Sequence, residues 1–333
     1  MAYDYDINGS YLYELSKMPD IRRGEFVHAQ GNDIPDKATL GVANGILTTD
    51  ATLHPFMVDI NGVKMTPISR FQNTSTLFDI KFMREYNLAT FDISEAWYWI
   101  PDKGQQYEIY RGAMMYLWNQ KANTEGMKRQ IVQRIYSSLT GKQLEGCETS
   151  KFGKMFNPFI PAHVQSASRI HVVKTCLDYK VSPIAITGDG FVCENEVIGL
   201  KCSDELGGWK LKQVGKCLSI GSNVIIFKDG KNSEDYELLM EQVKTNPKLD
   251  TYAKKWYSPI SLPVALQQDW EGLGNLHRLD RAFSVTSESK RLYPTKPKNC
   301  GDLVNGKYNS LPWNYDVLEF MADKIKVYED DTE

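Results

Sequence analysis

One four-residue sequence, Asp-Ile-Asn-Gly, occurs twice in the chain, at residues 6–9 and 59–62. The second copy lies between the apolar runs 55–60 and 63–68, and Asn-Gly in that setting is the strongest short signal of a β-hairpin. The first copy follows a short apolar run and precedes apolar residues at helical spacing, namely Leu12, Leu15 and Met18. The chain is therefore predicted to contain both antiparallel hairpins and a strand that runs directly into a helix.

Hydrophobic periodicity along the rest of the chain predicts an α+β protein. Helical spacing is found at residues 10–18, 78–88, 105–121, 125–140, 161–180, 234–245 and 261–270. Strand patterns are found at residues 3–7, 55–60, 63–68, 90–100, 183–187, 191–194, 208–213 and 217–227. Residues 22–50 are polar and glycine-rich, which predicts a loop or an extended excursion. The acidic end, residues 329–333, is predicted to be disordered.

Composition excludes several classes of protein. The 333 residues leave room for about two domains, and 39 Lys and Arg against 42 Asp and Glu give a net charge of −3, unlike a uniformly basic histone-like protein. No apolar run reaches the roughly 20 residues that span a bilayer, and the first residues lack the layout of a signal peptide. The six cysteines and five histidines show no zinc-binding spacing, which favours reduced, intracellular thiols.

Two acidic residues lie where strands are predicted to end. Asp6 ends the strand that enters the first helix, and Asp189 lies in Thr-Gly-Asp-Gly-Phe between the apolar runs 183–186 and 191–194. Each segment taken alone is typical of a hairpin turn. Carboxylates from two separate strands that converge can instead hold the divalent cations that phosphoryl transfer requires.

A third element is the predicted helix 125–140. Arg129, Gln133 and Ser137 are four residues apart and share one face, and Lys121 lies further back along the chain. Cationic and polar side chains on one helix face can bind a triphosphate, although a solvated surface stripe gives the same pattern.

The order of these three elements resembles the polymerase motifs of family B DNA polymerases, in particular the protein-primed branch of phages and linear plasmids. That family has Asp-x-x-Ser-Leu-Tyr-Pro, then Lys-x-x-x-Asn-Ser-x-Tyr-Gly, then Asp-Thr-Asp-Ser. The segments that carry the resemblance are residues 3–15, 121–142 and 183–194. The resemblance implies a right-hand fold with an antiparallel-sheet palm (1–100 and 143–228), helical fingers (101–142) and a mixed thumb with the acidic tail (229–333), without an exonuclease domain.

The resemblance also implies roles for individual residues. Asp6, the backbone of Ile7 and Asp189 are expected to bind two Mg²⁺ ions, for which Mn²⁺ can substitute, and Tyr11 is expected to pack under the incoming sugar. The residues expected to contact the nucleotide are Tyr11, Lys121, Arg129, Gln133 and Ser137. Those expected to contact the DNA backbone are Gly141, Lys142, Lys210, Lys212, Lys290 and Arg291.

The sequence departs from the family at several motif positions. Thr187 replaces the first Asp of the third motif, Gln133 occupies the position of the family lysine, and Ser137 and Thr140 replace Asn and Tyr. These changes leave three alternatives open: an active polymerase, a catalytically inactive palm-like subunit that binds nucleic acid or a partner polymerase, and a scaffold protein whose turns are only hairpins.

The favoured hypothesis is the core of a template-directed DNA polymerase of a phage or mobile element, located in the host cytoplasm and not in a membrane. It would act on primer-template DNA and dNTPs. Because the first motif begins at residue 6, we expect one part of a split polymerase whose second chain supplies an exonuclease or N-terminal part, or is a terminal protein. The surface that the second chain would cover is expected to include Leu12, Leu15, Phe26, Trp97, Tyr98 and Trp99.

Overall fold

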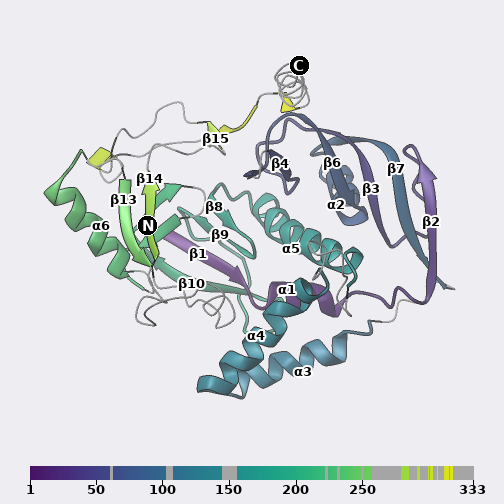
Figure 1. Ribbon diagram of the computed structural model, residues 1–333, viewed down its shortest axis with the longest axis horizontal. Helices are drawn as coiled ribbons and strands as arrows, with labels where there is room; N and C mark the ends of the chain where they lie inside the picture. Colours follow the sequence, from purple (N-terminus) through teal and green to yellow (C-terminus); the bar gives the residue numbers. More distant parts are fainter. Residues whose placement is uncertain are drawn as a thin grey trace, which may run out of the picture. The chain divides into compact units, whose positions relative to one another are not determined.

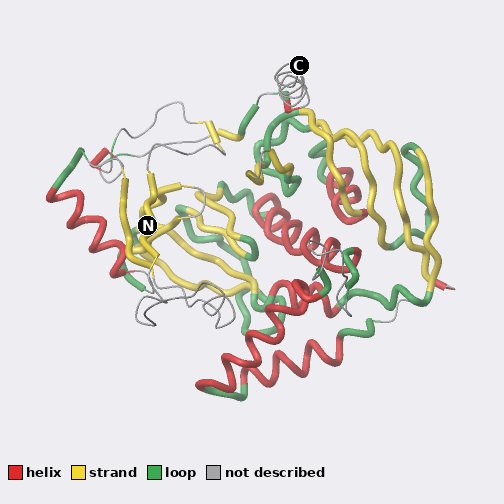
Figure 2. The backbone as a smooth tube through the Cα atoms, viewed as in Figure 1, coloured by secondary structure: helices red, strands yellow, loops and turns green. Residues whose placement is uncertain are grey.

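The computed structural model describes the main part of the chain and shorter segments beyond residue 250 (Figures 1 and 2). The described residues are 1–60, 63–102, 108–144, 156–221, 224–230, 233–248, 251–256, 279–284, 291–292, 299, 301–302, 306, 311–314 and 316–317. The chain divides into two units, one formed by residues 3–213 with 312–333, the other by residues 1–2 with 214–311.

The first unit contains a four-stranded sheet with the strand order β10-β1-β9-β8. Its strands are β1 (Ala2–Ile7), β8 (Pro183–Thr187), β9 (Gly190–Cys193) and β10 (Trp209–Gly215). In β1, Tyr5 and Ile7 lie in a core cluster with Phe191 and Trp209. Because side chains alternate along a strand, the even-numbered residues of β1 face the opposite side.

A second four-stranded sheet in this unit has the order β2-β7-β3-β6. Its strands are β2 (Gly24–Gln30), β3 (Leu40–Thr48), β6 (Arg70–Thr76) and β7 (Thr90–Pro101). Helix α2 (Leu77–Glu85) covers one of its faces (Figure 1). A short hairpin, β4 (Val58–Ile60) with β5 (Val63–Met65), confirms the strands predicted around residues 59–62.

The prediction of a loop over residues 22–50 is wrong, since this stretch contains β2 and β3. Small residues hide the strand pattern in β3. At Gly41, a Cβ atom would lie 2.4 Å from the ring of Tyr98 in the neighbouring strand β7. The ring of Tyr98 fills the space that a side chain at Gly41 would need. The sequence therefore has a glycine where a strand would ordinarily have a β-branched or aromatic residue.

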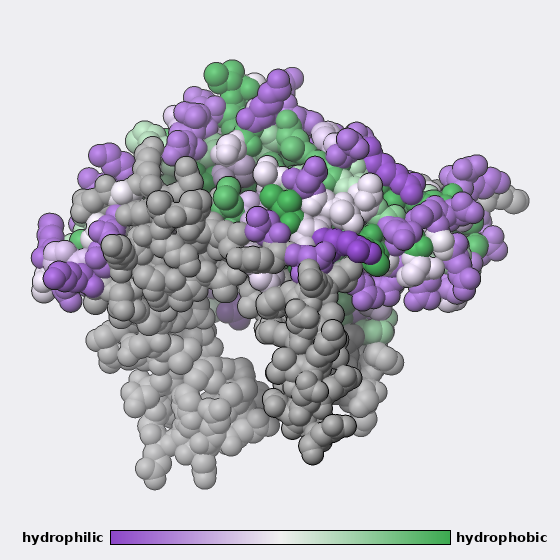
Figure 3. Space-filling model, turned by 90° about the horizontal axis from the view of Figure 1, so that it is seen from above, coloured by the Kyte–Doolittle hydropathy of each residue, from purple (hydrophilic) through white to green (hydrophobic). Residues whose placement is uncertain are grey.

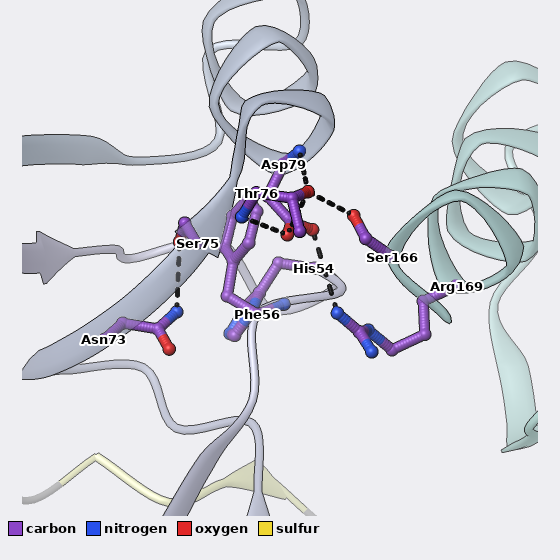
Figure 4. A network of polar contacts seen from close by, with 8 residues as sticks. All are labelled: His54, Phe56, Asn73, Ser75, Thr76, Asp79, Ser166 and Arg169. Carbon is purple, nitrogen blue, oxygen red and sulfur yellow. Dashed lines mark hydrogen bonds and ion pairs between the residues drawn. The ribbon is translucent and has the colours of Figure 1, made fainter. Parts of the chain in front are cut away.

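The described residues of the first unit also form the helices α1 (Ser10–Ser16), α3 (Arg111–Ala122), α4 (Gly126–Lys142) and α5 (Phe159–Asp178). The predicted pair of helices at 105–121 and 125–140 is confirmed by α3 and α4, which contact each other. The helix predicted at residues 161–180 is confirmed by α5, which is buried on several sides. Ser168 contacts Ser10 of α1, and Ser166 accepts a hydrogen bond from Thr76 at the start of α2 (Figure 4).

The second unit contains hairpin β11 (Cys217–Gly221) with β12 (Val224–Phe227), helix α6 (Ser233–Thr245), and β13 (Thr251–Trp256) paired with β14 (Leu279–Ser284). Two short strands, β15 (Arg291–Leu292) and β16 (Leu311–Pro312), are also present. The single strand predicted over residues 217–227 is wrong, because Cys217 pairs with Phe227 and the chain reverses between them. Predicted features at 261–270 and 329–333 lie outside the described residues.

The surface contains only part of the apolar patch that was expected. Leu12, Leu15, Tyr98 and Trp99 are buried, so their assignment to an uncovered surface is wrong. Phe26 and Trp97 are 46% and 48% exposed on the neighbouring strands β2 and β7. Elsewhere, hydrophilic and hydrophobic residues lie side by side over the described part of the face in Figure 3.

Two buried histidines make the stability of the fold dependent on pH. His54 accepts a hydrogen bond from the Phe56 N–H at 3.2 Å and lies 3.2 Å from the Pro67 carbonyl. Burial lowers the pKa of His54 to about 4, and burial also lowers the pKa of His163. The unfolded chain, with a histidine pKa of about 6.5, therefore binds more protons, so stability is lost as the pH falls from about 6.5 toward 4.

We expect the free energy of unfolding in urea to fall by about 2 kcal/mol between pH 7.5 and 5 through His54 alone. A His54→Gln variant should lose that part of the pH dependence, whatever its stability at pH 7.5. An unchanged slope of stability against pH in this variant would contradict the assignment.

Candidate active site

The structure brings the two predicted carboxylates together. Asp6 of β1 is paired with Gly190 of β9, and the Ile7 N–H donates a hydrogen bond to the Asp189 carbonyl at 2.8 Å. The two carboxylates are close enough for the charge of Asp6 to act on the pKa of Asp189. Residues from two distant parts of the sequence thus form one carboxylate pair, which we name the Asp6–Asp189 pair.

The local sequence explains this position of Asp189. Strands β8 and β9 form a hairpin, and Asp189 lies in the turn directly before Gly190. A Cβ atom on Gly190 would lie 2.2 Å from the carbonyl oxygen of Tyr5 in β1. Only glycine lets the two backbones approach this closely, and that approach places the turn beside the end of β1.

Two aspartates at this site have a raised pKa. Burial, and secondly the neighbouring charge of Asp6, raises the pKa of Asp189 from 3.8 to about 6. Burial also raises the pKa of Asp4, which shares the even-numbered face of β1. Such shifts are characteristic of sites where charges are gathered for binding or catalysis.

Two lysines of β10 face these aspartates. Lys210 Nζ lies 2.7 Å from Asp6 Oδ2, and Lys212 Nζ lies 3.8 Å from Asp4 Oδ2. The sequence predicted both lysines as contacts to the DNA backbone, and it did not predict these ion pairs. The negative charges of β1 therefore lie opposite the positive charges of β10.

The donor set of the pair fits a divalent cation. Within the described part of the chain, no cluster of three or more His, Cys, Asp and Glu side chains could hold a metal. Mg²⁺ needs only one or two carboxylates, because waters and substrate phosphates complete its six oxygen ligands. Two adjacent carboxylates, one of them with a pKa raised by burial and by the charge of the other, match that requirement.

Tyr11 of α1 also belongs to this site. Burial, and after it the charge of Asp189, raises the pKa of Tyr11, while Arg169 acts in the opposite direction. The hydroxyl of Tyr11 lies 4.0 Å from the position a Cβ atom would take on Gly188, in the turn that carries Asp189. Tyr13 points elsewhere, since its ring packs against Gly207. The two tyrosines thus lie on different sides of α1, as their spacing predicts.

For the other residues predicted to bind the nucleotide, the described side chains link α3 with α4 or face solvent, and their role stays a prediction. Lys121 lies over the rings of Trp118 and Tyr136, 5.0 and 5.2 Å from their centres, and so joins α3 to α4. Arg129 and Gln133 are exposed on α4. The side chain of Ser137 lies outside the described residues.

The remaining predicted DNA contacts are located as follows. Gly141 and Lys142 are exposed at the end of α4. Arg291 begins β15, but its side chain lies outside the described residues, as does the whole of Lys290.

Sequence reasoning missed Arg169 of α5. Its guanidinium Nη2 lies 3.9 Å from Asp79 Oδ1 of α2, and Figure 4 shows it reaching toward that carboxylate. Its influence on the pKa of Tyr11 places it within electrostatic range of the site. The sequence does show an arginine inside a helix of apolar and small residues. This pattern indicates a functional or structural role, because a charge in such a helix requires a partner or a ligand.

The comparisons with solved structures support a DNA polymerase-like fold for this chain. The solved structures similar to this chain include phi29 DNA polymerase complexed with primer-template DNA and incoming nucleotide substrates, with a TM-score of 0.55 and 12% identity over 86% of this chain. Phi29 DNA polymerase complexed with single-stranded DNA gives a TM-score of 0.56 and 13% identity, also over 86% of this chain. The chain spans about 58% of the phi29 polymerase chain. At this identity the likeness shows the fold alone.

Neither a protein-family model nor a curated protein sequence matches the chain. Among the described helices, none combines the length and apolar character needed to cross a membrane.

Proposed function

We propose that this chain is the core of a template-directed DNA polymerase of a phage or mobile element, within the protein-primed branch of family B. The observation that carries the proposal is the Asp6–Asp189 pair, formed by the two residues that the polymerase motifs single out. The polymerase-like fold supports the proposal, because in such a fold carboxylates at this point of the sheet would serve nucleotide transfer.

Each residue of the site would have its own role. Asp6, Asp189 and the backbone of Ile7 would hold two Mg²⁺ ions, which when bound supply activation of the primer hydroxyl and support for the triphosphate. Tyr11 would pack beneath the sugar of the incoming nucleotide. Arg169, directed by its ion pair with Asp79, would add a positive charge near that nucleotide.

The subdomain assignment is part of the proposal. Helices α3 and α4 lie within residues 101–142, the proposed fingers, and the sheet with the carboxylate pair would form the palm together with the sheet of β2, β3, β6 and β7. The second unit, with α6 and the strands after it, covers most of the proposed thumb at 229–333.

Primer extension tests the proposed activity. The purified chain is incubated with a labelled primer-template, the four dNTPs, and Mg²⁺ or Mn²⁺, alone and together with the products of neighbouring genes. Template-directed extension is the expected result. Binding of the primer-template with no extension under any of these conditions would instead support the inactive palm-like subunit.

That second candidate rests on two observations. Thr187 stands where the family has its first aspartate, and Lys210 pairs with Asp6. A subunit that only binds nucleic acid would tolerate both features. Its affinity for DNA would then be independent of divalent cations and of Asp189.

The proposal includes a second protein chain. Phe26 and Trp97 are exposed on adjacent strands, and Trp97 stacks on His28 at 4.6 Å, which leaves an aromatic patch at the surface. Aromatic residues are enriched in protein interfaces. Sedimentation of the chain with and without candidate partners tests this part, and a fully active monomer that binds none of them would contradict it.

Sugar selection provides a specific prediction. If Tyr11 packs beneath the ribose, Tyr11→Val should increase incorporation of ribonucleotides by about tenfold or more relative to dNTPs, since loss of one steric contact is worth about 1–3 kcal/mol. Tyr13→Val is the matched control, because Tyr13 lies two residues away on the other side of α1. The ratio of rNTP to dNTP incorporation is the measurement. An equal ratio in the wild type and the Tyr11 variant would assign sugar selection to another residue.

A further inference from the structure

The ion pair between Lys210 and Asp6 is the closest contact of a cation with the carboxylate pair. Lys210 Nζ lies 2.7 Å from Asp6 Oδ2, a charge-assisted hydrogen bond. The side chain of Asp6 is 17% exposed and that of Lys210 is 39% exposed. The lysine side chain is therefore more exposed than the aspartate side chain, so the lysine is the partner with more room to move.

The neighbouring pair on the same two strands is built differently. Lys212 Nζ lies 3.8 Å from Asp4 Oδ2, and Gln213 Nε2 donates to the same oxygen at 3.3 Å. Asp4 thus has a neutral donor besides its lysine, and its lysine contact is longer. Lys210 and Lys212 are two lysines of one strand, each facing an aspartate of β1, and the charge of Lys212 also acts on Asp189.

We propose that the Lys210 ammonium occupies the oxygen of Asp6 that a divalent cation would use, and that binding of the cation transfers Lys210 to a phosphate of the bound DNA. This inference rests on the proposed function and names the regulation of the same site. An ammonium ion and a divalent cation cannot both lie close to one carboxylate oxygen, because like charges repel strongly at such distances. Lysine carries a compact charge on a flexible stem, and phosphate is its common alternative partner.

The proposal has two consequences that oppose each other. Without DNA, Lys210 competes with the cation, so its removal should tighten metal binding. With DNA, the released lysine contributes to phosphate binding, so its removal should weaken the gain in DNA affinity that the cation produces. A lysine with a purely structural role would not move the two measurements in opposite directions.

The experiment compares Lys210→Met with the control Lys212→Met, which removes the same charge from the same strand. Mn²⁺ binding without DNA is measured by calorimetry. Binding of a primer-template with a dideoxy-terminated primer is then measured by fluorescence anisotropy with and without Mn²⁺. We expect Lys210→Met to bind Mn²⁺ about three- to fivefold more tightly than the wild type, the range of a partly exposed ion pair, and Lys212→Met to change it less.

In the second measurement, the increase in DNA affinity on addition of Mn²⁺ should be reduced about twofold or more in Lys210→Met and retained in Lys212→Met. Lys210→Gln serves as a second variant, and the unfolding midpoint of each variant shows that it is folded. Equal Mn²⁺ affinities in the two methionine variants, or weaker binding in Lys210→Met, would overturn the inference.

The failure of this inference is distinguishable from failure of the proposed function. If the wild type binds Mn²⁺ and extends primers, and the two methionine variants have equal Mn²⁺ affinities, only the transfer of Lys210 from Asp6 to phosphate is rejected. A wild type that binds neither Mn²⁺ nor DNA would reject both.

Discussion

Replacing Asp6 or Asp189 with asparagine is expected to lower the rate of nucleotide incorporation at least about 1000-fold, because each carboxylate would bind the catalytic cations directly. Rapid-quench measurement of a single incorporation step gives the rate. Asp36→Asn, a change of the same kind at an exposed aspartate, is the control and should leave the rate unchanged. Near-normal incorporation by either site variant would exclude the two-metal mechanism.

Loss of activity in the Asp189 variant should be accompanied by a gain in stability. The raised pKa of Asp189 means that the folded protein binds more protons than the unfolded chain between about pH 4 and 6. The stability contributed by this carboxyl is therefore present at low pH and is lost as the pH rises through about 6. At pH 7.5 and without metal, Asp189→Asn should thus melt a few degrees above the wild type. This gain should disappear near pH 4.

A second large effect is expected at the backbone that holds the pair together. Gly190→Ala should lower the free energy of unfolding by more than about 3 kcal/mol, since the new Cβ atom would meet the Tyr5 carbonyl at 2.2 Å and neither backbone can yield without breaking the β1–β9 ladder. Urea unfolding provides the measurement.

Gly112→Ala is the matched control for this substitution. Apart from its chain neighbours and the backbone of its own helix, nothing lies within 4 Å of the added Cβ position at Gly112 of α3. Alanine should therefore leave the protein as stable or up to about 1 kcal/mol more stable. If Gly190→Ala proves as stable as this control, the strands β1 and β9 do not pack as closely as described.

The elements whose signals are local were predictable from the sequence. Strand β1 and helix α1 follow from a short apolar run and a change of period within one segment. The hairpin of β8 and β9 follows from a glycine-rich turn between apolar runs, and α3 and α4 follow from helical spacing. The two aspartates could be selected because both lie at the ends of such elements.

Features that depend on contacts between distant segments could not be predicted. The register of β1 against β10 decides that Lys210 faces Asp6, and no pattern within either strand specifies this register. Likewise Gly41 in β3 is understood only beside the ring of Tyr98, so the strand was interpreted as a loop.

Buried polar residues caused the remaining errors. Nothing in the sequence indicates that Ser166 and Ser168 of α5 are buried, yet each hydroxyl meets another hydroxyl in the interior, at 2.8 and 2.7 Å. Arg169 was passed over for the same reason: its partner, Asp79, lies on a different helix. A polar side chain in a helix is informative about burial only when its partner is known.

The sheet order β10-β1-β9-β8 has a consequence for how the protein folds. Strand β1 is flanked by two strands that come from far along the chain, as the hydrogen bond from Asn8 to Ser203 across 195 positions illustrates. Contacts of such separation carry a large loop-closure entropy and form slowly, whereas hairpins and helix pairs form first. The Asp6–Asp189 pair should therefore be among the last features to assemble during refolding. Recovery of the proposed Mn²⁺ binding should accordingly lag behind the recovery of helical circular dichroism.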